Sequence, residues 1–279
     1  MYNFIAPLKN KVYYSQNRED LILSAFFPEV KKGFYVDVGA YDPDKDSVTK
    51  LFYKRGWAGI NIEPQNNKFA LFQKKRIRDT NLNIGISNKS GTLTLRSYEN
   101  QGLSTLSKEI KAKYEDDKAQ LKYDDIVVEV STLKNIFKQH NVEKIHFLKV
   151  DVEGFEYEVL EGNDWNKFRP EVICLEANHI IKNWKPILIT NKYELAFHDG
   201  LNEYYTDSGT NRKTNFDYVN HIVVERGGGL NTVDYELINK LHKDNTRLHK
   251  HIEYLDHLLS IAKTEKEHVD SPESSEDED

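Results

Sequence analysis

Short apolar runs alternate with amphipathic segments over residues 33–177 of the chain. The runs predict buried β-strands at Phe34–Gly39, Gly59–Glu63, Asn81–Ile86, Ile145–Asp151 and Glu171–Ala177. Between them, apolar residues at helical spacing predict helices at Lys45–Arg55, Asn67–Lys75, Ser131–His140 and Phe155–Leu160. Buried strands that alternate with helices are typical of a mostly parallel sheet that is covered on both faces. The pattern therefore predicts an α/β domain over residues 33–226.

The segments around this core predict further elements. Residues 1–32 are interpreted as a lead-in with a short helix, which Ser15 or Asn17 could cap. Extra strands are expected at Gly91–Ser97, Ile126–Val130 and Tyr218–Val224. Residues 100–125 are polar, so we expect a mobile loop with a helical piece that could cover the acceptor, and an inert surface loop is the alternative.

The pattern changes to a heptad repeat after Gly229. The first heptad positions are Ile238, Asn245, Ile252 and Leu259, and Leu241, Leu248, Leu255 and Ala262 follow three residues after each. Such a repeat with one buried asparagine favours a parallel two-stranded coiled coil, and a helix packed on its own domain is the alternative. We therefore expect a coiled-coil helix at 230–263, a homodimer through Ile238–Leu259, and a disordered acidic tail at 264–279.

The charge of the chain is concentrated at its end. The formal net charge is −6, and six acids lie in the last ten residues: Asp270, Glu273, Glu276, Asp277, Glu278 and Asp279. The rest of the chain is formally neutral and has no basic excess to bind a phosphate backbone. Nucleic acid is therefore not the expected partner.

The sequence indicates a reducing, water-soluble setting. Its single cysteine, Cys174, lies in an apolar run, which predicts a buried and inert thiol. The first residues lack the apolar stretch of a signal peptide. No segment approaches the roughly 18 apolar residues of a membrane span. We expect a cytoplasmic protein with no membrane partner.

A glycine turn closes the first predicted strand, in the segment Val36-Asp37-Val38-Gly39. Such a turn lets the backbone approach a bound cofactor closely. The segment has one glycine where a dinucleotide fingerprint has three, and a diphosphate needs the bare helix start that those glycines provide. S-adenosylmethionine (SAM) has no diphosphate, so this turn fits SAM better than a dinucleotide.

A buried acid is expected at the end of the second predicted strand. Glu63 follows Gly39 by close to the roughly 20 residues that separate such a turn from a ribose-binding acid in a doubly wound sheet. A carboxylate there can accept hydrogen bonds from both ribose hydroxyls. An exposed acid at the end of a strand is the alternative.

Polar residues also follow the last two predicted core strands. Ligands of open α/β sheets bind at the carboxyl ends of the strands, near the point where the strand order reverses. Asp151 is therefore expected to point toward the reaction centre, although it could instead cap the next helix. Glu176, Asn178 and His179 should face the same cleft from the other side.

Taken together, these blocks resemble the FkbM family of methyltransferases. They are Tyr14-Ser15-Gln16 with Glu19-Asp20, Phe34 to Ala40 with Pro43 and Ser47-Val48-Thr49, Gly56 to Pro64, Asn83 to Ser87, Leu148 to Glu156, and Arg169-Pro170 followed by Glu176. The resemblance covers roughly residues 13–225, and the heptad segment and the acidic tail lie outside it.

The resemblance implies a class I methyltransferase fold, which is Rossmann-like, with SAM as the methyl donor. Members of the family methylate hydroxyls of sugars, polyketides and similar acceptors. The candidate cofactor-binding residues are Asp37, Gly39, Ala40, Tyr41, Glu63, Pro64, Gly85 and Ile86. Gly85 and Ile86 would lie near the adenine. No Asn/Asp-Pro-Pro-Tyr segment follows the relevant strand, which argues against a nucleobase amine as acceptor.

Methylation of a hydroxyl requires a group that accepts its proton. The candidate catalytic residues are Asp151 and Glu153, with His179 as the competing base. A bound Mg²⁺ held by Asp151, Glu153 and Glu176 could instead lower the pKa of the hydroxyl. The acids show no spacing specific to a metal, so the sequence assigns no metal ligand.

The expected acceptor is the hydroxyl of a sugar or glycan. Four aromatic residues could stack on a sugar face at the carboxyl edge of the sheet, and the alternative is that most of them are core residues: Trp184, Phe197, Tyr204 and Tyr205. A catalytically silent scaffold that oligomerises through its coiled coil is the alternative function. A nicotinamide-dependent oxidoreductase is disfavoured by the missing glycines after Gly39.

Overall fold

The structure is a computed structural model that describes residues 12–98, 102–117, 121–210 and 212. The strand predicted at Tyr218–Val224, the coiled-coil helix at 230–263 and the tail at 264–279 lie outside these residues. Within them, no helix is both long and apolar enough to cross a membrane.

A seven-stranded sheet with the order β3-β2-β1-β7-β8-β10-β9 forms the centre of the fold. Its parallel strands are β1 (Phe34–Val38), β2 (Ala58–Ile62), β3 (Thr80–Leu82), β7 (Phe147–Val150) and β8 (Val172–Glu176). The strand β10 (Asn202–Asp207) is antiparallel to both β8 and β9 (Tyr193–His198). This mostly parallel sheet confirms the predicted Rossmann-like α/β fold.

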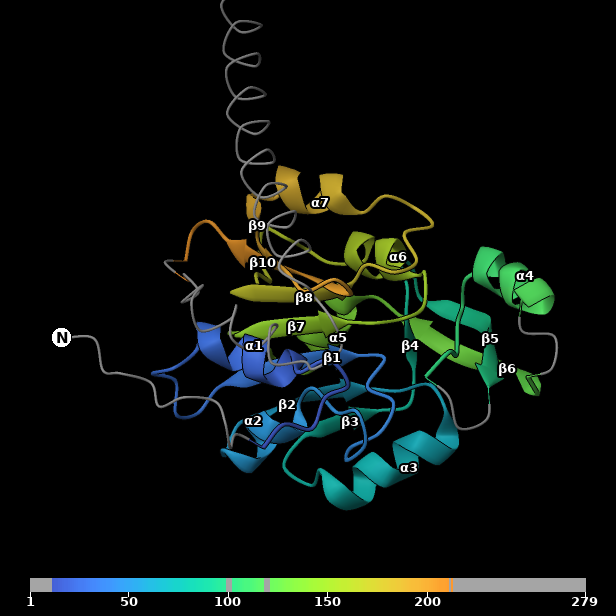
Figure 1. Ribbon diagram of the computed structural model, residues 1–279, viewed down its shortest axis with the longest axis horizontal. Coiled ribbons are helices and arrows are strands. Elements are labelled where there is room, and N and C mark those ends of the chain that lie inside the picture. The colour runs from blue at the N-terminus through green and yellow to red at the C-terminus, as the bar shows by residue number, and fades with distance from the viewer. Residues whose placement is uncertain (1–11, 99–101, 118–120, 211, 213–279) are drawn as a thin grey trace, which may run out of the picture. The chain divides into compact units, whose positions relative to one another are not determined.

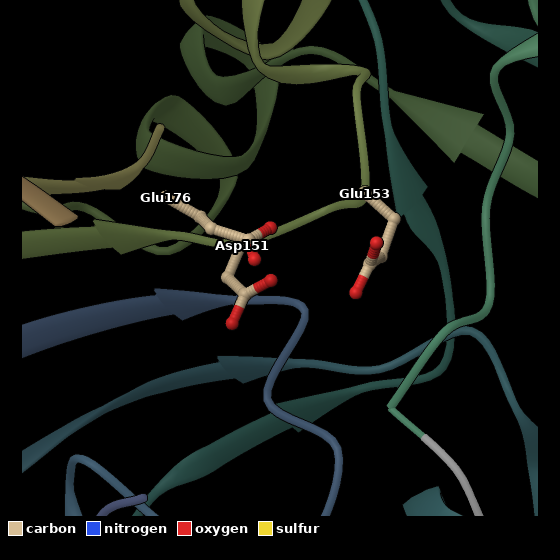
Figure 2. Close-up of side chains that lie close together, drawn as sticks. All are labelled: Asp151, Glu153 and Glu176. Atoms are coloured by element: carbon tan, nitrogen blue, oxygen red, sulfur yellow. The ribbon is translucent and has the colours of Figure 1, made fainter. Parts of the chain in front are cut away.

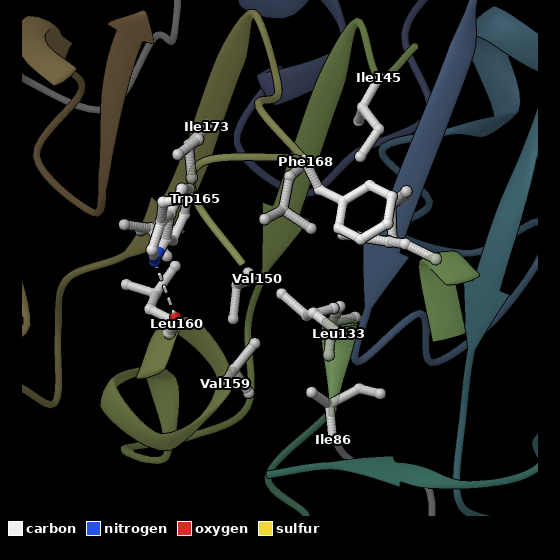
Figure 3. Close-up of a cluster of buried hydrophobic side chains, with 14 of the residues drawn as sticks. Ile86, Leu133, Ile145, Val150, Val159, Leu160, Trp165, Phe168 and Ile173 are labelled. Atoms are coloured by element: carbon white, nitrogen blue, oxygen red, sulfur yellow. Dashed lines mark hydrogen bonds between the residues drawn. The ribbon is translucent and has the colours of Figure 1, made fainter. Parts of the chain in front are cut away.

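Helices cover both faces of the sheet (Figure 1). The helices α1 (Glu19–Phe26) and α2 (Lys50–Lys54) contribute to one core, and α5 (Leu133–Gln139), α6 (Glu156–Glu161) and α7 (Lys185–Thr190) contribute to the other. Strand β1 contributes side chains to both cores, because Val36 and Val38 point to one face of the sheet and Tyr35 points to the other. Figure 3 shows part of the larger core, where Trp165 donates a hydrogen bond to the Leu160 carbonyl.

Several predicted helix starts are wrong by a few residues, and local hydrogen bonds explain why. Helix α2 begins at Lys50 rather than Lys45, since the Asp42 carboxylate accepts the backbone N–H of Lys45 in a turn. Thr132, not Ser131, caps α5 through its side-chain oxygen. Arg18 occupies the N-cap position of α1.

A second, three-stranded sheet stands beside the main one, in the order β4-β6-β5. It consists of β4 (Gly85–Ile86), β5 (Gly91–Tyr98) and β6 (Tyr123–Ser131). The predicted strand Asn81–Ile86 is therefore split, with β3 in the main sheet and β4 in this one. Between β5 and β6 the chain forms α4 (Lys108–Asp117), the helical piece expected within residues 100–125. In Figure 1 the small sheet and α4 lie together at one end of the main-sheet strands.

Candidate functional site

The strand order reverses between β1 and β7, and the candidate site lies where these two neighbouring strands end. Gly39 follows β1 with a φ of +78°, and a Cβ atom added to it would lie 1.9 Å from the backbone oxygen of Asp151. The glycine is thus required by the close approach of two loops, as well as by the turn. Both Gly39 and Asp151 line a pocket at this point of the fold.

We expect Gly39→Ala to destabilise the fold by on the order of 3 kcal/mol. A left-handed alanine costs about 1–2 kcal/mol, and the clash with Asp151 adds about 1–3 kcal/mol. Gly56→Ala is the matched control, because Gly56 has a φ of +90° but no atom within 4 Å of an added Cβ. Urea unfolding of both variants measures the difference, and equal losses would show that the contact with Asp151 is unimportant.

A pocket of roughly 540 Å³, open solvent included, extends from this reversal point toward the small sheet. It is lined by Val38, Gly39, Tyr41, Ile62, Glu63, Pro64, Gln65, Ile84, Gly85, Ile86, Leu95, Gly102, Ser104, Leu106, Asp151 and Val152. Apolar side chains make up the end near β4 and β5, and polar groups lie near the ends of β1, β2 and β7. A nucleoside needs this division, with apolar walls for the base and hydrogen-bonding groups for the sugar.

Glu63 is the buried acid of this pocket, and only 3% of the residue is exposed. Its carboxylate accepts the backbone N–H groups of Tyr41 at 2.8 Å and Gln65 at 2.9 Å. Burial raises the pKa of Glu63 to about 7, and these two N–H groups oppose the rise. The remaining lone pairs of its oxygens can accept hydroxyl donors, so Glu63 suits a ribose.

The structure brings most of the predicted cofactor residues together. Gly39, Tyr41, Glu63, Pro64, Gly85 and Ile86 all line the pocket. Ala40 is outside the lining, and its backbone N–H donates to the Ile62 carbonyl at 3.1 Å. Asp37 is also outside it. The prediction that Asp37 contacts the cofactor is therefore not supported, because alternation along β1 points Asp37 to the other face of the sheet from Val38.

Asp37 instead supports the site through Lys149. The Asp37 carboxylate lies 3.5 Å from Lys149 Nζ and accepts the Thr49 hydroxyl at 3.4 Å. Lys149 Nζ in turn donates to the Gly39 carbonyl at 3.1 Å and lies 3.3 Å from Asp151 Oδ2. Burial opposes the charge of Lys149, but Asp151 and Asp37 raise its pKa. One buried ammonium group therefore holds both loops at the strand reversal.

Three carboxylates converge at the carboxyl ends of β7 and β8 (Figure 2). Asp151, Glu153 and Glu176 each place an oxygen within 4.8 Å of the others. Burial, together with the charges of Asp151 and Glu153, raises the pKa of Glu176, so this acid retains a proton at neutral pH. A divalent cation could also neutralise such a cluster, since carboxylate oxygens are the ligands that Mg²⁺ and Ca²⁺ prefer.

Glu153 is the most constrained member of this cluster. Its backbone is left-handed, with a φ of +50°, and Gly154 continues the turn at +86°. The Glu153 carboxylate lies 3.6 Å from His179 Nε2 and accepts the Tyr114 hydroxyl at 2.8 Å. The structure therefore brings two of the predicted catalytic residues, Glu153 and His179, into contact, and adds Tyr114, which the sequence did not predict.

The four aromatic residues expected to stack on a sugar are core residues instead. Trp184 and Tyr205 belong to one hydrophobic core, and Phe197 and Tyr204 belong to the other. Each is at most 4% exposed. Their side chains therefore do not form a sugar-binding surface, and this support for a glycan acceptor is removed.

Part of the pocket wall was not predicted from the sequence. Ile84, Leu95 and Leu106 form much of its apolar end, and Gln65 lies beside Glu63. Alternation along β5, which places Leu93 and Leu95 on one side, was an available signal for Leu95. The polar segment 100–125 was expected to cover the acceptor, and its Gly102 and Ser104 line the pocket that also contains Glu63.

Comparison with known proteins agrees with this geometry. Residues 37–223 match the family model for the methyltransferase FkbM domain. The chain is also similar to Methyltransferase sdnD of Sordaria araneosa, with 32% identity over a 138-residue alignment that covers 42% of this chain and 51% of the relative. It thus spans about half the length of this curated relative. Because the family match extends over more than half of the chain, the protein belongs to the FkbM methyltransferase family.

Proposed function

We propose that the protein is a SAM-dependent O-methyltransferase that acts on a hydroxyl of an uncharged sugar or similar polyol. The observation that carries this proposal is the double position of Asp151. It lines the pocket beside the strand reversal and also belongs to the carboxylate cluster. A methyl donor in the pocket and a proton acceptor in the cluster would therefore meet at one point.

The pocket residues divide the work of holding SAM. Glu63 accepts the ribose hydroxyls, and Ile86 and Leu95 pack against the adenine, while the turn at Gly39 and Tyr41 faces the rest of the molecule. When bound, SAM supplies a methyl group that is already activated by its sulfonium. The protein must therefore position the acceptor oxygen and take up its proton, and positioning alone can supply about 7–11 kcal/mol.

Glu153 accepts the proton of the acceptor hydroxyl in this proposal. It is 7% exposed and lies 3.6 Å from the His179 imidazole, which can take over this proton from the carboxyl group. Asp151 is paired with Lys149 at 3.3 Å and orients the hydroxyl by accepting a hydrogen bond. Glu176, which retains its proton, can donate one.

The charge of the cluster selects the class of acceptor. Asp151 lines the pocket and Glu153 lies beside it in the cluster, and the nearby Lys149 is already engaged by Asp37 and Asp151. A phosphate or carboxylate on the acceptor would be repelled there. Hydroxyl groups, in contrast, are good donors to carboxylates, so the proposal names an uncharged polyol.

Two measurements test this function. Calorimetric titration of the purified chain with SAM and S-adenosylhomocysteine should show micromolar binding. Transfer of a labelled methyl group from SAM should then occur to neutral methyl glycosides and not to the corresponding sugar phosphates. Absence of binding to either nucleoside would overturn the proposed SAM-dependent activity. Preference for the sugar phosphates would overturn only the proposed class of acceptor.

A further inference from the structure

The helix α4 is docked on the turn that presents Glu153. Its Ile110 and Tyr114 form a small buried cluster with Tyr98 of β5. Ile110 lies so close to Gly154 that an added Cβ there would be 2.6 Å from Ile110 Cγ1. The segment between β5 and β6 therefore forms one wall of the carboxylate cluster.

The turn at Glu153 needs support from outside itself. A left-handed conformation costs a residue other than glycine about 1–2 kcal/mol, and such strain persists only where the surroundings hold it. Three contacts hold it here. The Thr105 hydroxyl donates to the Glu153 carbonyl at 2.7 Å, the Tyr114 hydroxyl donates to its carboxylate at 2.8 Å, and the Glu156 carboxylate accepts the Gly154 N–H at 3.2 Å. Thr105 and Tyr114 both belong to the segment between β5 and β6.

Tyr114 also touches the base on its other side. Its hydroxyl lies 3.3 Å from His179 Nε2, and the two rings meet edge to face with centroids 6.1 Å apart. Burial and the charge of Glu153 raise the pKa of Tyr114, so the hydroxyl stays protonated and remains a donor to Glu153. One hydroxyl therefore links the carboxylate and the imidazole.

We propose that Tyr114 is a positioning residue of the methyl-transfer site, which holds the Glu153 carboxylate and the His179 imidazole in one arrangement. This role rests on the proposed function of Glu153 as the proton acceptor. The Tyr114 hydroxyl occupies a carboxylate oxygen that His179 would otherwise approach as a partner. It thereby keeps His179 Nε2 at 3.6 Å from that oxygen, which is longer than a direct hydrogen bond.

The test compares Tyr114→Phe with Tyr98→Phe, which removes a hydroxyl from the same buried cluster but keeps the contact with Glu153. The first readout is the pKa of His179, measured by NMR on protein labelled at histidine and assigned with His179→Gln. Glu153 and Tyr114 are titratable groups that contact the His179 imidazole, and Glu176 belongs to the same carboxylate cluster as Glu153. In Tyr114→Phe the imidazolium pairs directly with Glu153, so its pKa should rise by at least about 0.5 pH units.

The second readout is turnover with the best methyl glycoside. Tyr114→Phe should lower kcat by about 10–100-fold and leave KM nearly unchanged, because misplacement of the base affects the chemical step. Tyr98→Phe should change neither quantity. An unchanged or lowered His179 pKa in Tyr114→Phe overturns the inference, as does equal loss of turnover in both variants. The NMR titration needs neither SAM nor acceptor, so it gives an answer even where the proposed methyl transfer fails.

Discussion

Replacement of Glu63 by alanine should weaken the binding of S-adenosylhomocysteine by on the order of 100-fold or more. Each hydrogen bond to a charged group contributes about 1.5–3 kcal/mol, and two ribose hydroxyls would lose their acceptor. A loss of about 3 kcal/mol already corresponds to roughly 100-fold in the dissociation constant. Isothermal titration calorimetry of the wild-type and variant proteins measures this change directly.

Glu63→Gln is the control for a general collapse of the pocket. Its amide keeps the size of the side chain and one oxygen that can accept the N–H of Tyr41 or Gln65. We expect an intermediate loss of affinity and a far-ultraviolet spectrum like that of the wild type. Tight binding by the alanine variant would place the ribose elsewhere and remove Glu63 from the site.

The affinity should also depend on pH, because burial raises the pKa of Glu63 in the empty pocket to about 7. Hydroxyl donors favour the ionised carboxylate, so binding below pH 7 must first remove a proton. The affinity should therefore fall as the pH decreases, by about tenfold between pH 8 and pH 6. Glu63→Gln should show no such change over the same interval, and an equal pH dependence in both proteins would assign the titration to another group.

The fold was predictable because the central strands are buried on both faces. Each reads as a nearly continuous apolar run, and a parallel strand between two helical layers requires this. Because β1 is buried on both faces, the sequence pattern did not show to which face the Asp37 side chain points. In a strand with one exposed face, an acid marks the solvent side, whereas in β1 both Tyr35 and Val36 are fully buried. The sequence therefore placed Asp37 at the site but did not show which face of β1 its side chain lies on.

The strand ends were predictable for a topological reason. Glu63 and Asp151 follow parallel strands, and the carboxyl ends of parallel strands meet at one edge of the sheet. Tyr114 could not be placed in this way, since it comes from a polar segment whose docking depends on tertiary contacts. The only local signal was the pair Ile110 and Tyr114, which lie on one face of a short helix in otherwise polar surroundings.

Glu153→Gln should lower kcat by about 10²–10⁴-fold, the range that general-base catalysis supplies. Glutamine keeps the shape of the side chain and an oxygen that can accept the Tyr114 hydroxyl, but it cannot take up a proton. Binding of S-adenosylhomocysteine should stay within about twofold, because Glu153 is outside the pocket lining. Methyl transfer to a neutral methyl glycoside, followed under saturating SAM, measures the effect.

Parallel variants at the neighbouring groups assign the role within the cluster. Asp151→Asn should lower kcat less than Glu153→Gln does, because an amide can still orient a hydroxyl. His179→Gln should also lower kcat less than Glu153→Gln does, because Glu153 remains as the proton acceptor. If His179→Gln is instead the most damaging change, the imidazole is the base and Glu153 orients it through the 3.6 Å contact. If a chelator abolishes turnover and added Mg²⁺ restores it, the cluster of Asp151, Glu153 and Glu176 binds a metal ion instead of acting as the proton acceptor.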